Sequence, residues 1–297
     1  MNNDKYNWIY FFREKGEDLL RSLSSNFYVK DASTLINNKI SSDKNFEITR
    51  IINLASQEQW SREKLLNDIL CITYASYIAM LEYRNKVWAY DYMTFSRRIG
   101  ELWEPFCKLS FMYPTKKLLI TSPPDFNQIK RDIKNDAINF IRNLPISLED
   151  KNDLIKLYET PWSLMGSGSI KLDLDLHFTQ NNYYYNCDFK SGFSSNEKGN
   201  TNRLLLVGSI YRSLNQYTRN IIFVRQPEDQ NNHYLQKLKF SQYWEVYCAD
   251  DAYSIMAEFT GFNLKSWLES NVDWINDIDK EFRQHLERNN LISYLTW

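Results

Sequence analysis

The chain has 297 residues, of which 43% are hydrophobic, enough to bury the core of one large domain. Its net charge of −1 argues against a protein that coats nucleic acid without specificity, because such proteins carry a large positive excess. The four cysteines form no Cys-x-x-Cys pair, which argues against a structural zinc site. The first residues lack the profile of a signal peptide, and the longest apolar run, between Asp68 and Glu82, is too short to span a bilayer. We therefore expect a cytoplasmic protein without a membrane segment.

The first 160 residues are predicted to be mainly helical. Ser56-Gln57-Glu58-Gln59 resembles a capping box and is expected to open a helix. The segment from residue 24 to about 45 is polar and mixed in composition. The spacing of apolar residues predicts helices over residues 6–23, 56–81, 88–103 (ending before Pro105), 126–143 and 147–158.

The most informative stretch is a predicted β-hairpin over residues 170–190. From Ile170 to Phe178 apolar and polar side chains alternate, which is typical of a strand with one buried face. Thr179–Asn182 is rich in turn-forming residues, and Tyr183–Phe189 is aromatic enough to be the returning strand. The polar face of the first strand carries Lys171, Asp173, Asp175 and His177.

The register of this hairpin decides which carboxylate faces Asp188. A four-residue loop would put Asp173 opposite Asp188, whereas a two-residue turn would put Asp175 there. Lys190 lies on the same face as Asp188 because two residues separate them along the strand. In either register, two carboxylates and a lysine are expected to share one patch of a sheet.

Such a patch suits metal-assisted hydrolysis of phosphodiester bonds. Carboxylates from two strands hold Mg²⁺ while leaving most of its octahedral positions to water and phosphate oxygens. The metal lowers the pKa of a bound water, and a nearby ammonium stabilises the negative charge that develops. The alternative interpretation is a solvated strand face with a cross-strand ion pair, which an isolated Asp-x-Lys pattern does not exclude.

Asp173 or Asp175 on one strand, followed by Asp188-Phe189-Lys190 on the next, resembles the catalytic signature of the PD-(D/E)XK nuclease superfamily. The continuation Ser191–Arg203 is most similar to type II restriction endonucleases, where a Gly/Ser-rich bend leads into a polar helix start near the DNA. The resemblance covers about residues 160–226. It implies Asp173, Asp188 and Lys190 as catalytic residues, and Asp173, Asp175 and Asp188 as ligands of Mg²⁺.

The sequence departs from the superfamily motif at one position. Leu172, rather than proline, precedes Asp173. This departure leaves open whether Asp173 or Asp175 is the metal ligand.

The same resemblance implies that the segment after Lys190 faces DNA. Asn200, Thr201 or Asn202 is predicted to cap the following helix, whose N-terminus would present backbone N–H groups to an anion. The expected DNA-binding residues are Ser191, Ser194, Asn196, Lys198, Asn200, Asn202 and Arg203.

The remainder of the chain is predicted to complete an α/β fold. Residues 221–224 form an apolar run suited to a strand buried on both faces, and residues 243–248 are expected to add another strand. A helix is expected from Asp250, and residues 263–290 are predicted to be helical. We expect a mixed central sheet with flanking helices, by resemblance a restriction-endonuclease-like core. The single domain, 1–297, would comprise a mainly helical part (1–160), the catalytic core (161–250) and C-terminal helices (251–297).

These features predict a Mg²⁺-dependent type II restriction endonuclease that cuts double-stranded DNA at a short specific sequence. By the same resemblance it would act as a homodimer, because the two strands of a symmetric site need two active sites. Two alternatives stay open. One is a repair or recombination nuclease of the same superfamily, and the other is a catalytically silent module that binds DNA or protein.

Overall fold

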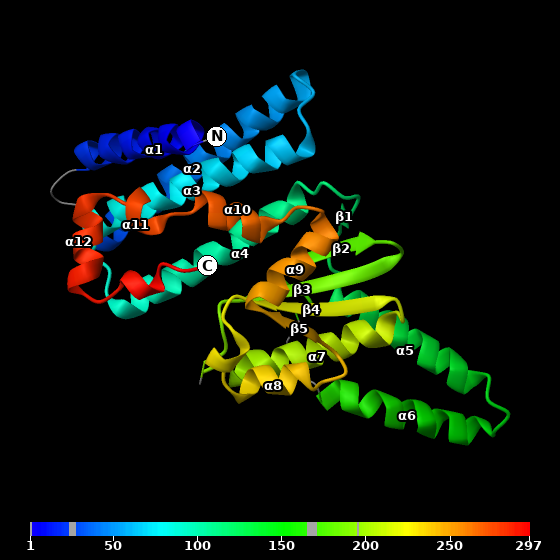
Figure 1. Ribbon diagram of the computed structural model, residues 1–297. Coiled ribbons are helices and arrows are strands. Elements are labelled where there is room, and N and C mark those ends of the chain that lie inside the picture. Colours follow the sequence, from blue (N-terminus) through cyan, green and yellow to red (C-terminus); the bar gives the residue numbers. More distant parts are fainter. Residues whose placement is uncertain (1, 24–27, 165–170, 195) are drawn as a thin grey trace.

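The computed structural model describes residues 2–23, 28–164, 171–194 and 196–297. In these residues, helices and one five-stranded mixed sheet form an α/β fold (Figure 1). The first helices are α1 (Asn2–Ser22), α2 (Val29–Gln57), α3 (Arg62–Val87), α4 (Tyr92–Met112), α5 (Phe126–Arg142) and α6 (Leu148–Leu164). The strands are β1 (Leu119–Ile120), β2 (Leu176–Gln180), β3 (Tyr183–Lys190), β4 (Thr218–Val224) and β5 (Glu245–Cys248). The later helices are α7 (Lys198–Leu214), α8 (His233–Lys239), α9 (Ala249–Thr260), α10 (Leu264–Asn271), α11 (Trp274–Asp277) and α12 (Lys280–Arg288).

The helical N-terminal part differs from the prediction at two boundaries. Residues 29–45 of the polar, mixed segment belong to α2, residues 24–27 lie outside the described residues, and the expected capping box at Ser56 lies at the end of this helix. The cap of α3 is instead Ser61, whose Oγ accepts a hydrogen bond from the backbone N–H of Lys64 at 3.1 Å. Helix α4 continues through Pro105, which lies on its exposed side, where water can bind the carbonyl that the proline leaves without a donor.

Helix α3 is the central helix of this part. It is long and apolar enough to cross a membrane, but 83% of its most apolar window is buried inside the fold. Helices α1, α2 and α4 pack against it. Its apolar residues therefore form the core of this helical part.

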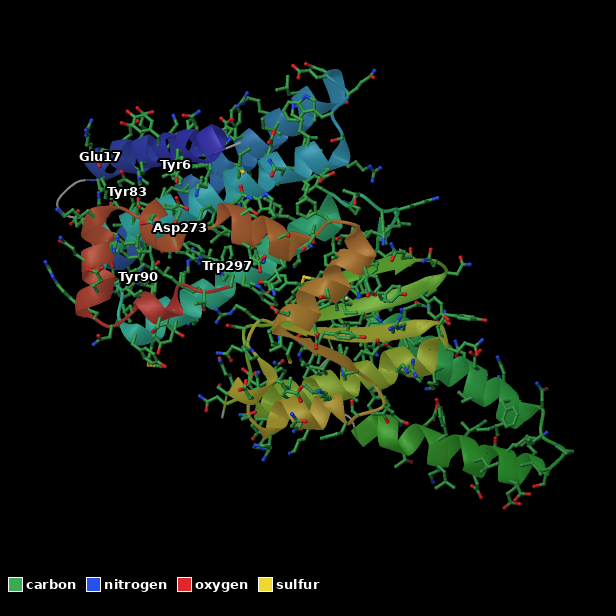
Figure 2. The ribbon with its side chains drawn as sticks, viewed as in Figure 1. Tyr6, Glu17, Tyr83, Tyr90, Asp273 and Trp297 are labelled. Atoms are coloured by element: carbon green, nitrogen blue, oxygen red, sulfur yellow. The ribbon has the colours of Figure 1, made fainter. Side chains whose placement is uncertain are left out.

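The C-terminal residues close the helical part. Residues 263–290 form three short helices, α10 to α12, because Asn263, Asp273 and Asp279 each cap a new helix with a side-chain oxygen. Trp297 then packs against Phe106 with ring centroids 4.8 Å apart (Figure 2).

The sheet has the order β1-β2-β3-β4-β5, antiparallel from β1 to β3 and parallel from β3 to β5. A two-residue turn, Asn181-Asn182, joins β2 to β3, with φ values of 52° and 66° that suit a type I′ turn. The strand expected over 170–178 is shorter than predicted: Ile170 lies outside the described residues, and residues 171–174 have no strand partner. Leu172 is buried instead against Val207 and Tyr211 of α7.

The two faces of the sheet are buried against different helices. Phe178, Phe189 and Phe223 point into the large core, where each ring contacts Phe111 of α4. On the other face, Ile222 and Val224 pack in a smaller cluster with residues of α7 and α8.

Helix α7 lies close to the second face because of Gly208. A Cβ atom at this position would lie 2.4 Å from Nε1 of Trp244, which donates a hydrogen bond to the backbone carbonyl of Leu204 at 2.8 Å. The helix begins at Lys198, with Glu197 as a cap residue whose side chain makes no cap hydrogen bond. Asn200, Thr201 and Asn202 therefore lie inside the first turns of α7 and do not cap it, contrary to the prediction.

Candidate active site

The two-residue turn decides which carboxylate faces Asp188. The register pairs Leu176 with Cys187, and its continuation by one residue brings Asp175 opposite Asp188. Oδ2 of Asp175 accepts a hydrogen bond from the backbone N–H of Phe189 at 2.7 Å, which holds the two carboxylates beside each other. Asp173 is exposed one step further out, and its backbone carbonyl accepts a long hydrogen bond of 3.4 Å from Arg203.

Asp188 is almost completely buried, with 1% of its surface exposed. Nζ of Lys190 lies 2.5 Å from Oδ2, and Nη2 of Arg203 lies 3.7 Å from Oδ1. Among the described residues, the ammonium of Lys190 is the cationic partner of Oδ2, and no other group donates a hydrogen bond to this oxygen. A divalent cation could bind here in place of the ammonium.

The electrostatics of the pair follow from burial. The pKa of Asp188 is raised from 3.8 to about 6, mainly by burial and in part by the charge of Asp175, while Lys190 and Arg203 oppose the increase. The ionised carboxylate thus carries a free-energy cost in the folded protein at neutral pH. A divalent cation at Oδ2 would remove much of that cost.

A chain of buried hydrogen bonds supports the segment that carries Asp175. Nε2 of His177 accepts a hydrogen bond from the backbone N–H of Leu174 at 3.1 Å, so the ring proton lies on Nδ1, which donates to Asn186 at 2.8 Å. Asn186 in turn donates to Asn220 at 3.0 Å, and Asn220 to the carbonyl of Gly208 in α7. Although His177 belongs to the polar face of the predicted hairpin, it is buried, and burial lowers its pKa. His177, Asn186 and Asn220 lie opposite one another on β2, β3 and β4 and share one face of the sheet. Their matching positions along the three strands are the sequence signal that could have revealed this network.

A cleft of about 520 Å³ opens beside the end of β3 that carries Lys190. One wall is α4, and the other is formed by the loop from Lys190 to Ser194 and by Glu197. A Cβ atom on Gly100 of α4 would lie 2.8 Å from Oγ of Ser191, so the glycine allows the two walls to approach closely. The charged residues that α4 contributes are Arg97, Glu101 and Glu104. Sequence reasoning did not identify them because they lie far from the hairpin in the chain.

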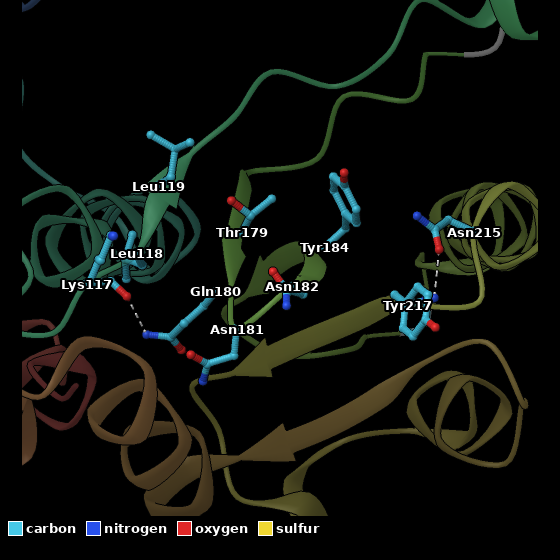
Figure 3. Close-up of a pocket in the computed structure, with 10 residues that line it drawn as sticks. All are labelled: Lys117, Leu118, Leu119, Thr179, Gln180, Asn181, Asn182, Tyr184, Asn215 and Tyr217. Carbon is cyan, nitrogen blue, oxygen red and sulfur yellow. Dashed lines mark hydrogen bonds between the residues drawn. The ribbon is translucent and has the colours of Figure 1, made fainter.

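A larger hollow of about 800 Å³ lies at the opposite end of β3, around the turn of the β2–β3 hairpin (Figure 3). Its lining consists mainly of amide, hydroxyl and aromatic groups, with Lys117 as its charged side chain. Gln180 already donates there to the carbonyl of Lys117 at 3.1 Å. The hollow is lined by no carboxylate, whereas Lys190 of the candidate site lines the cleft, although Asp175 and Asp188 do not. We therefore associate the candidate site with the cleft through Lys190.

The expected DNA-binding residues fall into two groups. Three interact within the protein: Ser191 accepts a hydrogen bond from Arg225 at 2.8 Å, Asn200 donates to Glu197 at 2.9 Å, and Arg203 turns toward Asp188. The exposed group comprises Ser194, Asn196, Lys198 and Asn202.

The residues present fit a Mg²⁺ ion. The described residues contain no cluster of three or more His, Cys, Asp or Glu side chains that would enclose a metal. Mg²⁺ does not need one, since one or two carboxylates suffice when water and phosphate oxygens complete its octahedron. The carboxylates of Asp175 and Asp188 meet this requirement.

Comparisons with known proteins do not place the chain in a family. No family model matches it, and neither a curated protein nor a solved structure does. Functional inference therefore rests on the site itself.

Proposed function

We propose that this chain is a Mg²⁺-dependent endonuclease that hydrolyses phosphodiester bonds of double-stranded DNA. By its resemblance to the PD-(D/E)XK superfamily, we propose more specifically a type II restriction endonuclease that acts as a homodimer at a short sequence. The observation that carries this proposal is the buried carboxylate of Asp188, which lies beside Asp175 and whose Oδ2 is 2.5 Å from the ammonium of Lys190.

The arrangement of the sheet supports the same proposal. A hairpin, a helix and a parallel strand follow one another from β2 to β4, and both acidic residues lie on neighbouring strands of the hairpin. This order is compatible with a restriction-endonuclease-like core, which we propose as the finer description of the fold.

Each charged residue has a distinct role in the proposed reaction. Asp175 and Asp188 would hold Mg²⁺. When bound, the ion would lower the pKa of a coordinated water and neutralise negative charge on the phosphate. Lys190 would turn its ammonium from Asp188 to the attacking water or to the developing oxyanion. Arg203 offsets part of the negative charge of the two carboxylates from the opposite side. Asp173, exposed at the rim, would act as an auxiliary ligand.

The exposed polar residues after β3 would contact the DNA. Ser194 lines the cleft, and Asn196, Lys198 and Asn202 are exposed around the N-terminus of α7. Backbone N–H groups and the positive end of the helix dipole favour a phosphate at such a position.

Digestion of plasmid and phage DNA tests the activity. The wild type should produce discrete fragments with Mg²⁺, whereas Asp188→Ala and Lys190→Ala should produce none at equal protein concentration. Asp250→Ala, which removes an exposed carboxylate of α9, is the matched control and should cut normally. Wild-type protein that never cuts DNA with Mg²⁺, or an Asp188→Ala variant that still does, would contradict the proposal. Smears or cleavage of branched DNA would favour the repair or recombination nuclease.

One observation favours a catalytically silent module. Asp188 and Lys190 form a buried ion pair, which can serve to hold the loop after β3 in place without any metal. Calorimetric titration with Mg²⁺ separates the two functions. Binding heat in the wild type that is absent in Asp188→Ala supports the nuclease, and the absence of heat in both supports the silent module.

A further inference from the structure

Helices α5 and α6 form a hairpin that projects beyond the sheet (Figure 1). Nζ of Lys134 contacts Oε1 of Glu159 at 2.7 Å, so the two helices lie antiparallel along much of their length. The base of the hairpin is fixed by Ile129, which packs against Leu172 and α7. The opposite end, around the 143–147 connection, extends away from the base.

This hairpin exposes an unusual amount of apolar surface. Isolated exposed apolar residues are common, but a group of them on one projecting element marks an interaction surface. The exposed residues of the hairpin, with their exposed fractions, are Ile133 (36%), Phe140 (69%), Ile146 (39%), Leu148 (75%), Leu154 (38%) and Leu157 (69%).

Two exposed apolar residues of each helix lie on one side of the hairpin, Ile133 and Phe140 on α5 and Leu154 and Leu157 on α6. On α5, the residues that α6 covers lie between positions 134 and 141. With about 100° of rotation per residue around the helix axis, Ile133 and Phe140 point about a quarter-turn away from the covered side. On α6 the covered positions lie between 151 and 158, and Leu154 and Leu157 are rotated in the same sense. Because the helices are antiparallel and face each other, equal rotations bring both apolar stripes to the same side.

The charges of the two helices are complementary. Helix α5 carries four Lys and Arg residues against two Asp, a net charge of +2. Helix α6 carries two Lys against four Asp and Glu, a net charge of −2. When the two-fold axis runs parallel to the helices, α5 of one protomer lies against α6 of its partner, so each contact between protomers joins opposite charges and this arrangement is favoured. The result is a four-helix bundle, a stable arrangement that one hairpin cannot form alone.

The available area is sufficient for a dimer. A helix of 17 residues is about 25 Å long, and two helices side by side are about 20 Å wide, so the face covers about 500 Å². Two such faces bury about 1,000 Å², which is the size at which specific interfaces begin.

We propose that the apolar face of the α5–α6 hairpin is the surface through which two copies of this chain associate. This surface would be the interface of the homodimer in the proposed function, and the proposal rests on that function to this extent. The apolar residues and charges that support it do not depend on catalysis. The base of the hairpin packs against Leu172, so the hairpin that forms the interface contacts the segment that carries Asp173 and Asp175.

Light scattering after size-exclusion chromatography tests the interface. The wild type at about 10 µM, above a micromolar Kd, should have the mass of a dimer, which is twice 35.6 kDa or 71.2 kDa. Phe140→Glu and Leu157→Glu, one on each helix, should each raise the dimer Kd by about a hundredfold. Two-fold symmetry places each substitution in the interface twice. If each copy weakens the dimer tenfold, the two together raise the Kd by about a hundredfold.

The matched control is Phe46→Glu, because Phe46 is a helical phenylalanine that is 68% exposed, like Phe140 at 69%, but lies on α2. It should remain dimeric, and circular dichroism should show unchanged helix content in all variants. A monomeric wild type, dimeric Phe140→Glu and Leu157→Glu, or a monomeric Phe46→Glu would overturn the proposal. Asp188→Ala should remain a dimer, so loss of cleavage and loss of association are read separately.

Discussion

Replacing Asp188 by asparagine should abolish cleavage and yet stabilise the protein at neutral pH. Asparagine keeps the shape of the side chain and removes its charge. The pKa of this buried carboxyl is raised from 3.8 to about 6, mainly by burial. At about 1.4 kcal/mol per pH unit, the difference corresponds to a cost of up to about 3 kcal/mol for keeping the group ionised in the folded state.

The pH dependence has a defined sign. The folded state binds a proton at Asp188 more tightly than the unfolded state does, so the stability linked to protonation is fully present below pH 3.8 and is lost as the pH rises through about 6. The advantage of Asp188→Asn should therefore be about 3 kcal/mol at pH 8, about half of that at pH 5, and absent below pH 3.8. For a chain of this size, about 3 kcal/mol corresponds to a Tm increase of about 5 °C.

The control is a second buried aspartate with a structural role. Oδ2 of Asp277 accepts hydrogen bonds from Lys5 and from Tyr74, both at 2.8 Å. Asp277→Asn leaves the buried ammonium of Lys5 without its counter-charge, which should destabilise the protein by about 3–5 kcal/mol. Two buried Asp→Asn changes should thus shift stability in opposite directions.

Urea unfolding at pH 5 and pH 8, monitored by circular dichroism, measures both effects. Addition of Mg²⁺ at ten times its Kd should raise the unfolding free energy of the wild type by about 1.4 kcal/mol and leave Asp188→Asn unchanged. The reasoning is refuted if Asp188→Asn is less stable than the wild type at pH 8, or if its advantage does not shrink at pH 5. The first result would mean that the pairing with Lys190 and Arg203 outweighs burial.

Three further outcomes are expected. Asp175→Asn should abolish DNA cleavage while Asp173→Asn retains at least part of it, because only Asp175 lies opposite Asp188; equal losses in a plasmid assay would show that the hairpin register does not select the ligand. Phe111→Ala should cost about 3–5 kcal/mol in urea unfolding, since its buried ring joins α4 to the sheet; a cost below 1 kcal/mol would contradict that role. Arg225→Met should lower the cleavage rate at saturating DNA without changing DNA affinity in gel-shift assays, because Arg225 positions Ser191 next to Lys190 and does not line the cleft; a loss of affinity alone would indicate a direct DNA contact.

The amino-acid sequence by itself was sufficient to predict the hairpin, the strand after α7 and most helices. These features depend on short-range periodicity, which survives in any tertiary context. The hairpin register required one choice that the sequence did not make: both loop lengths kept a carboxylate opposite Asp188. The structure selects the two-residue turn, because two asparagines tolerate the positive φ values that such a turn requires.

Only the tertiary structure decided how buried the site is and what surrounds it. His177 and Asp188 lie on a face with polar alternation, which predicts exposure, but α7 covers that face and converts it into a hydrogen-bonded interior. The second wall of the cleft comes from α4, almost a hundred residues earlier in the chain. Contacts of this kind depend on how distant elements pack, and a local pattern carries no information about them.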